Sequence, residues 1–242
     1  MSTGTFHFPA NKAILTDIFN TLLKEAGPRQ WWPAKTAFEV MVGAILTQNT
    51  SWRNVEKAIA NIRKEKLLSF KKFSALKVEK IAQLVRPSGY YNQKAKRLKI
   101  LTDFIHSEYG GSIKRMVDSD TTKLREELLS LNGVGMETAD SILLYALNKP
   151  VFVVDLYTKR ILSRHEILPF DSSYEEVQRF FMENLSPDVS HYNEYHALLV
   201  FAGNRYCRKT PDCEECPLNK ISYNGEQLIS PTSKDQSSRQ IS

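Results

Sequence analysis

The sequence has no long apolar run, few cysteines and hardly any strand-forming segments, and each shortage excludes a class of protein. None of its hydrophobic stretches approaches the roughly 20 residues that a membrane span needs, so we expect no membrane partner. Its first residues, MSTGTFHFPANK, lack the charged-then-apolar layout of a secretory signal. The 3 cysteines are an odd number confined to one short segment, which argues against a disulfide framework. We therefore expect a cytoplasmic protein.

What the sequence does contain is an excess of positive charge. Lysine and arginine together number 33 against 27 acidic residues, a formal net charge of +6 at pH 7. An acidic polymer such as nucleic acid is a reasonable partner for such a chain, although many basic proteins bind nothing anionic. With 42% hydrophobic residues, the composition is that of a folded globular protein.

Helical patterns recur from end to end, separated by glycine, proline and asparagine. Residues 38–46 are apolar on nearly every face, which predicts a buried helix. Asp120 is placed to cap the helix that follows it, and a further helix runs through METADSILLYALN until Pro150 ends it. The best strand candidate, residues 151–154, is only a short apolar run. We therefore expect an all-α fold.

Two features of the sequence after Asp120 are candidates for a functional role as well as a structural one. Gly133-Val134-Gly135 lies between two helices, and its glycines leave backbone N–H groups uncovered at the start of the second one, where they could hold a phosphate oxygen. An ordinary helix–helix turn is the alternative. Asp155 precedes another helix and is placed to be its N-cap. The succession of hairpin, helix, apolar link and aspartate favours a functional assembly.

The stretch LNGVGMETADSILLYALNKPVFVVDLYTKRI resembles the signature of the endonuclease III superfamily of helix-hairpin-helix DNA glycosylases. The resemblance extends from Trp31 to Ser222 and implies base excision repair of damaged duplex DNA in the cytoplasm, at a bacterial-type nucleoid. It implies that Gly133, Val134 and Gly135 hold DNA phosphates and that Asp155 is the catalytic residue. A fixed carboxylate suits this chemistry, because breaking the base–sugar bond generates positive charge on the sugar and the carboxylate can also activate water.

The same resemblance implies two helical domains, with DNA bound in the cleft between them. We expect one domain at residues 31–150, containing the hairpin, and a second formed by 1–30 together with 151–224, containing Asp155 and the cysteines. Residues 225–242 are polar, with little to bury, and predict a disordered tail. We expect a monomer.

The position of Glu137 bears on the type of reaction. Bifunctional members of the superfamily carry a lysine two residues after the second hairpin glycine, and its amine forms a Schiff base with the sugar. Glu137 stands at that place, and a carboxylate cannot form an imine. The resemblance therefore implies a monofunctional glycosylase. Two alternatives stay open: a bifunctional glycosylase/lyase acting on oxidised pyrimidines, and a non-catalytic hairpin module that only binds DNA.

Three further motifs, WWP, LTQNT and VRPSGYYNQKAKRL, resemble the 3-methyladenine DNA glycosylase III branch of the superfamily. The resemblance implies that aromatic residues line a pocket for the extruded base and that Gln48 fills the gap left in the duplex. The implied substrates are N-alkylated purines such as 3-methyladenine, which leave without protonation. No histidine lies in these motifs to act as a general acid, which suits such a substrate.

The residues expected in this site could also have purely structural roles. Tryptophans beside a proline are often packing features, and a run of basic residues is often a solvated helix face. The base-pocket candidates are Trp31, Trp32, Pro33 and Trp52. The candidates for phosphate contact beyond the hairpin are Lys94, Lys96 and Arg97.

The cysteines follow the last long helix with the spacing Cys207-x5-Cys213-x2-Cys216. Endonuclease III relatives hold a [4Fe-4S] cluster with the spacing C-x6-C-x2-C-x5-C. Here the first gap is one residue shorter, and Ser222 stands where the fourth cysteine would fall. A [4Fe-4S] cluster is therefore a candidate cofactor, with two alternatives: zinc held by the thiolates and a histidine such as His196, or no metal.

Overall fold

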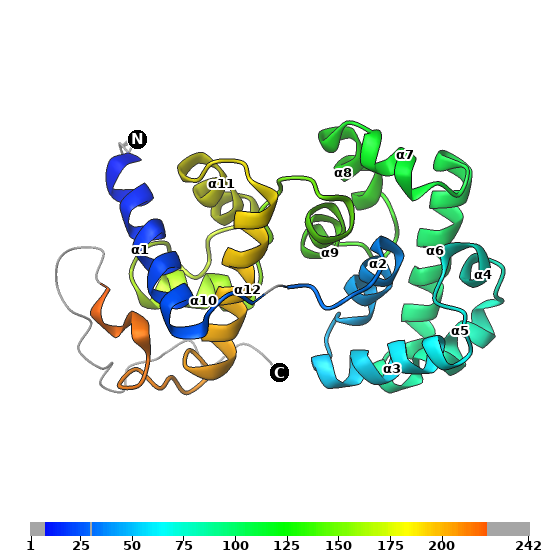
Figure 1. The fold of residues 1–242 in the computed structure, drawn as a ribbon, viewed down its shortest axis with the longest axis horizontal. Helices are drawn as coiled ribbons and strands as arrows, with labels where there is room; N and C mark the ends of the chain where they lie inside the picture. The colour runs from blue at the N-terminus through cyan, green and yellow to red at the C-terminus, as the bar shows by residue number, and fades with distance from the viewer. Residues whose placement is uncertain (1–7, 30, 222–242) are drawn as a thin grey trace. The chain divides into compact units, whose positions relative to one another are not determined.

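The computed structural model describes residues 8–29 and 31–221, and this part of the chain is all-α as predicted, with 12 α-helices and no β-strand (Figure 1). It divides into two compact units. One comprises the described residues up to Trp31 and those from Val154 onward; the other is Trp32–Val153. The predicted tail at 225–242 and Ser222 lie outside the described residues. Among the described helices, none is long and apolar enough to cross a bilayer.

The unit Trp32–Val153 is a bundle of mostly short helices. In chain order they are α2 (Ala37–Leu46), α3 (Trp52–Lys64), α4 (Phe70–Ser74), α5 (Val78–Val85), the 3-10 turn η1 (Arg86–Ser88), α6 (Tyr91–Tyr109), α7 (Ile113–Asp118), α8 (Thr121–Leu129), α9 (Met136–Ser141) and the π-helical turn η2 (Ile142–Ala146). The long helix α6 packs against α5 and also contacts α2. The loop after α2 lies against the hairpin between α8 and α9, where the Gln48 side chain donates to the Gly133 carbonyl.

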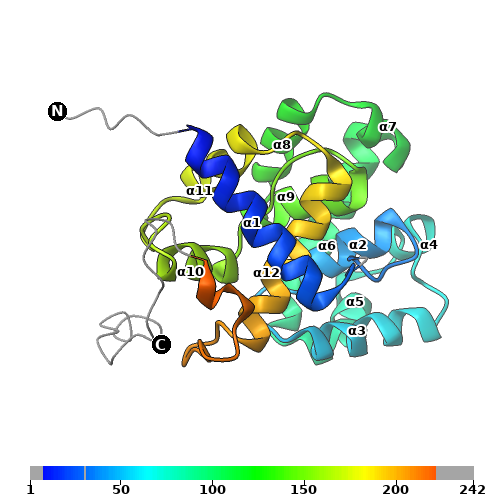
Figure 2. The same ribbon diagram turned by 60° about the vertical axis from the view of Figure 1, so that its left-hand side comes forward.

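The other unit is built on two long helices, α1 (Phe8–Ala26) and α12 (Val189–Arg205), which lie side by side (Figure 2). The buried Tyr195 of α12 donates its hydroxyl to the Leu15 carbonyl at 2.7 Å. The remaining elements are α10 (Leu156–Arg164), α11 (Tyr174–Asn184) and the 3-10 turn η3 (Pro217–Lys220). Helix α10, which Asp155 precedes, packs against α12.

The predicted buried helix at 38–46 is confirmed as α2, in which every residue from Phe38 to Leu46 is buried. Even Glu39 is only 5% exposed, and its carboxylate pairs with the guanidinium of Arg63 on α3. A buried carboxylate needs such a partner, because leaving its charge unpaired away from water is costly. This ion pair ties α2 to α3.

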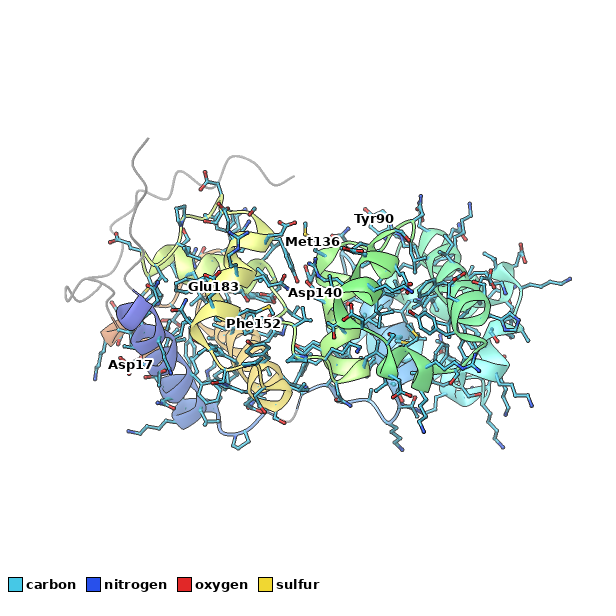
Figure 3. All side chains as sticks on the ribbon, turned by 90° about the horizontal axis from the view of Figure 1, so that it is seen from above. Asp17, Tyr90, Met136, Asp140, Phe152 and Glu183 are labelled. Carbon is cyan, nitrogen blue, oxygen red and sulfur yellow. The ribbon has the colours of Figure 1, made fainter. Side chains whose placement is uncertain are left out.

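The two helices of the hairpin are formed as predicted. Asp120 caps α8 by accepting a hydrogen bond from the Lys123 backbone N–H at 2.9 Å. A buried ion pair joins α8 to α9: Asp140 is fully buried and accepts two hydrogen bonds from Arg125, at 2.7 and 3.0 Å. Met136 and Asp140, both labelled in Figure 3, mark the start and the buried face of α9. The bidentate contact fixes the angle between the helices of the hairpin.

The predicted strand at 151–154 is wrong. Val151 to Val154 are all buried, Phe152 included, but they form an irregular link rather than a strand (Figure 3). A strand needs a neighbouring strand for its backbone groups, and the described residues offer none. The Val154 N–H instead donates to the hydroxyl of Tyr174, at 3.3 Å.

Candidate functional site

The hairpin turn uses its two glycines differently. Gly133 has φ +86°, and a Cβ there would lie 2.6 Å from both Cγ and Cδ of Arg97. Gly135 is extended, with φ −90° and ψ 176°, and a Cβ there would meet nothing within 4 Å. Val134 between them is buried. The turn is therefore anchored by the Val134 side chain, while the backbone at Gly135 is exposed where α9 begins.

Hydrogen bonds from Gln48, which Arg97 in turn contacts, stabilise this turn. The Gln48 side-chain amide donates to the Gly133 carbonyl and to the Thr138 hydroxyl, both at 3.0 Å, and Arg97 donates to the Gln48 side-chain carbonyl. Both ends of the Gln48 amide are thus used within the protein. The expected roles of Gln48 in the duplex gap and of Arg97 on a phosphate stay predictions. In the structure, Gln48 and Arg97 support the hairpin.

The prediction that Lys94 contacts a phosphate is wrong. Its side chain is only 1% exposed, and the ammonium group donates to the carbonyls of Leu46 and Ser88, at 3.0 and 2.7 Å. Burial, followed by the charge of Arg97, lowers the pKa of Lys94 to about 8. Lys94 therefore holds the end of α2 and the turn η1 together. Lys96, from the same basic run, is exposed as expected.

An aromatic cluster forms within the unit Trp32–Val153. The Trp32 ring lies 5.2 Å from that of Trp52 and 5.4 Å from that of Tyr145, measured between centroids. Gly43 makes room for it, since a Cβ at Gly43 would lie 2.9 Å from the Trp32 ring. Pro33 is exposed, whereas Trp31 belongs to the other unit. The structure thus brings two of the predicted pocket residues together.

Tyr145 is the member of this cluster that sequence reasoning missed. It lies in the π-helical turn η2, inside a stretch whose sequence pattern predicts only an apolar helix. The signal that could have found it is its aromatic ring, which is unusual among the small and aliphatic residues of SILLYAL. Irregular π turns of this kind frequently occur at functional sites.

Asp155 caps α10, as predicted. Its Oδ1 atom accepts hydrogen bonds from the Thr158 backbone N–H at 2.7 Å and from the Thr158 hydroxyl at 2.9 Å. The side chain is 12% exposed and lies at the N-terminus of the helix, where the helix dipole favours negative charge. Asp155 is therefore a fixed carboxylate that keeps limited access to solvent.

The fold also brings a histidine to Asp155, although no histidine lies in the sequence motifs. His196 of α12 is buried, and its Nε2 atom lies 3.6 Å from Asp155 Oδ2. Burial lowers the pKa of His196, and the charge of Asp155 opposes this shift only in part. The imidazole is thus held mainly in its neutral form. The sequence alone suggests His196 only as a zinc ligand.

Glu137 occupies the expected lysine position on an exposed part of the first turn of α9. Two lysines of the same unit are buried. Lys149 donates to the carbonyls of Val117 and Ser119, at 3.1 and 2.6 Å, and Lys94 has the carbonyl partners described above. Neither buried amine is placed to act as a nucleophile toward DNA, because each is directed at main-chain carbonyls inside the unit.

The arrangement around the cysteines does not fit the expected cluster. No group of three or more His, Cys, Asp or Glu side chains in the described part of the chain is placed to hold a metal ion. Burial, with smaller contributions from Cys207 and Cys213, raises the pKa of Cys216 to about 11, and burial also raises the pKa of Cys213, so both are thiols in the metal-free protein. The zinc set with His196 is wrong, because His196 lies against Asp155.

An arginine organises the cysteine segment instead. Arg164, at the end of α10, donates to the Cys207 sulfur at 3.2 Å and to the carbonyls of Arg208 and Lys209, at 2.7 and 3.1 Å. A guanidinium group has five donors in one plane and can hold several acceptors of a loop at once. The start of the segment is therefore fixed to α10 by contacts within the protein.

Comparison with known proteins identifies relatives over most of the chain. Residues 42–187 match the family model described as HhH-GPD superfamily base excision DNA repair protein. A provisionally named DNA repair glycosylase of Methanocaldococcus jannaschii is 50% identical over 205 residues, which cover 84% of this chain and 93% of the relative.

Two solved structures extend the comparison. The Helicobacter pylori 3-methyladenine DNA glycosylase MagIII, bound to 1,N6-ethenoadenine, is 33% identical with a TM-score of 0.71; the match covers 81% of this chain and 97% of that one. An endonuclease III in a trapped covalent intermediate with DNA has a TM-score of 0.73 at 24% identity, over 88% and 96% of the two chains. The second likeness concerns the fold alone.

Proposed function

The chain belongs to the HhH-GPD superfamily of base excision DNA repair proteins and is a DNA glycosylase. We propose that it is a monofunctional enzyme that releases N-alkylated purines from duplex DNA. The observation that carries the proposal is the carboxylate of Asp155, which is held at a helix N-terminus by Thr158 with its second oxygen still available for chemistry.

In this proposal, Asp155 stabilises the positive charge that develops on the sugar as the base departs. The bond between C1′ of the sugar and the base nitrogen breaks, and its electron pair leaves with the base. Water adds to C1′ and gives its proton to Asp155, which yields a free base and an intact abasic site. An N-alkylated purine is already cationic in the nucleoside, so it leaves as a neutral base without a general acid.

The absence of lyase activity is proposed from Glu137. The position that carries the Schiff-base lysine in bifunctional relatives is here an exposed carboxylate. The buried lysines Lys94 and Lys149 donate to main-chain carbonyls, so neither offers a substitute amine. The enzyme should therefore stop at the abasic site.

The substrate class is proposed from the aromatic cluster and from MagIII. Trp32 and Trp52 offer flat, electron-rich surfaces on which a cationic purine can stack. MagIII, which is bound to an ethenoadenine in its structure, is 33% identical to this chain. We propose that the hairpin backbone at Gly135 contacts the DNA phosphates, which leaves the aromatic cluster to select the base.

The catalytic role is tested with Asp155→Asn. Asparagine is also a good N-cap, so the variant should fold and bind DNA. Base release from methylated duplex DNA should fall by at least on the order of a hundredfold, because a transition-state charge is lost. Asp188→Asn is the matched control, since Asp188 caps α12 by accepting from the His191 N–H at 2.6 Å. Near-normal base release by Asp155→Asn would refute the proposal.

The type of reaction is tested on the same DNA. The enzyme should release 3-methyladenine and leave abasic sites whose backbone breaks only after alkali is added. Borohydride should trap no covalent protein–DNA adduct. A trapped adduct, or release of thymine glycol in preference to an alkylated purine, would instead support the bifunctional alternative.

A further inference from the structure

The two carboxylate oxygens of Asp155 have different partners. Oδ1 accepts both hydrogen bonds from Thr158, at 2.7 and 2.9 Å. Oδ2 faces His196, whose Nε2 atom is 3.6 Å away. With Oδ1 anchored, small coupled rotations about the Cα–Cβ and Cβ–Cγ bonds can still shift Oδ2. The position of Oδ2 therefore depends on what lies beside it.

His196 is well placed to fix that oxygen. It comes from α12, which packs against α10, and its side chain is 8% exposed. Its position is set by a long helix whose buried face also carries Tyr192 and Tyr195, both fully buried. A side chain mounted on such a face has little freedom to move. Hydrogen bonds at catalytic groups are often long without substrate and tighten when it binds, so 3.6 Å is compatible with donation in the working complex.

We propose that His196 is a positioning residue for Asp155: as a neutral imidazole with its proton on Nε2, it orients Oδ2, the oxygen that acts in base release. This inference rests on the proposed catalytic role of Asp155. Thr158 and His196 then hold the two oxygens of one carboxylate from two different helices, which fixes its plane.

The charge of His196 matters as much as its place. An imidazolium beside Asp155 would offset the negative charge that stabilises the sugar cation. A neutral imidazole can donate one hydrogen bond and leave that charge intact. The burial of His196 lowers its pKa and so favours the neutral form. A histidine is thus compatible with a mechanism that requires no general acid.

The test compares two variants of similar shape, His196→Gln and His196→Met. Glutamine can place an N–H near the position of Nε2, whereas methionine cannot. In single-turnover release of 3-methyladenine from methylated duplex DNA, His196→Met should be slower by on the order of tenfold or more, because a misplaced catalytic group is costly. His196→Gln should recover most of the rate. Binding to a duplex with an abasic-site analogue should be unchanged in both.

A double-mutant cycle separates this inference from the proposed function. If His196 acts through Asp155, adding His196→Met to Asp155→Asn should cause no further loss of rate. Wild-type rates in both His196 variants, beside a slow Asp155→Asn, would overturn the inference alone. Equal losses in the methionine and glutamine variants would also overturn it, because they would indicate a packing role. A fully active Asp155→Asn would overturn the proposed function itself.

A measurement on the wild-type protein covers the case in which the variants do not fold. Nitrogen NMR of ¹⁵N-histidine-labelled enzyme at neutral pH reports which ring nitrogen of each histidine carries the proton. We expect His196 to be neutral and protonated on Nε2. An imidazolium, or a neutral ring protonated on Nδ1, would overturn the inference, since neither is the species proposed.

Discussion

Replacing Gly133 with alanine should destabilise the hairpin, through two effects that can be worked out separately. First, Gly133 has φ +86°, a conformation that costs a residue with a Cβ about 1–2 kcal/mol. Second, the new Cβ would lie 2.6 Å from Cγ and Cδ of Arg97. Arg97 would have to move and would lose its hydrogen bond to Gln48, worth about 0.5–1.5 kcal/mol.

The sum is about 1.5–3.5 kcal/mol, which corresponds to a fall in Tm of about 3–14 °C for a chain of this size. The assay is thermal unfolding, with two alanine controls. At Gly27, φ is +65° and a Cβ would meet nothing within 4 Å, so Gly27→Ala should show the backbone cost alone. At Gly135, φ is −90° and the space is open, so Gly135→Ala should leave Tm nearly unchanged.

Two results would refute this reasoning. If Gly133→Ala and Gly27→Ala lower Tm equally, the contact with Arg97 contributes nothing. If Gly135→Ala lowers Tm as much as Gly133→Ala, the two glycines do not differ as the backbone angles indicate. Duplex binding adds a second readout, because a displaced hairpin should bind DNA more weakly even where the protein is fully folded.

Four further predictions concern other parts of the two units. Because the pKa of Lys94 is lowered from 10.5 to about 8 in the folded protein, its amine takes up a proton on unfolding at pH values between these two. The wild type should therefore gain stability relative to Lys94→Met as the pH rises through that range. Denaturation of both proteins at several pH values measures the difference in stability, and a difference that does not change with pH would contradict the prediction. Trp52→Ala should slow base release more than it weakens DNA binding, since stacking on one base is worth about 1–3 kcal/mol; equal losses in both assays would argue for a packing role. Arg164→Met should speed the reaction of Cys207 with a thiol reagent. The anaerobically purified wild type should lack the broad visible absorption of an iron–sulfur cluster. A coloured, iron-containing protein would contradict our account of the cysteine segment.

Much of the candidate site could be predicted from sequence because it depends on neighbouring residues. The hairpin glycines, the cap at Asp120 and the cap at Asp155 each follow from turn and capping preferences that act over a few positions. The all-apolar pattern at 38–46 likewise predicts a buried helix wherever that helix packs. Local physics therefore determined the all-α fold and the placement of the candidate catalytic carboxylate before a helix.

Only the tertiary structure decided which partner each polar side chain has. Lys94 belongs to a basic run that is typical of a surface, yet α6 turns it inward onto the carbonyls of Leu46 and Ser88. The apolar run at 151–154 could have been a strand, but a strand requires a second strand, and the helical fold provides none in the described chain. His196 meets Asp155 because α10 packs on α12. Contacts between residues distant in sequence depend on how the helices pack, and no local pattern encodes that packing.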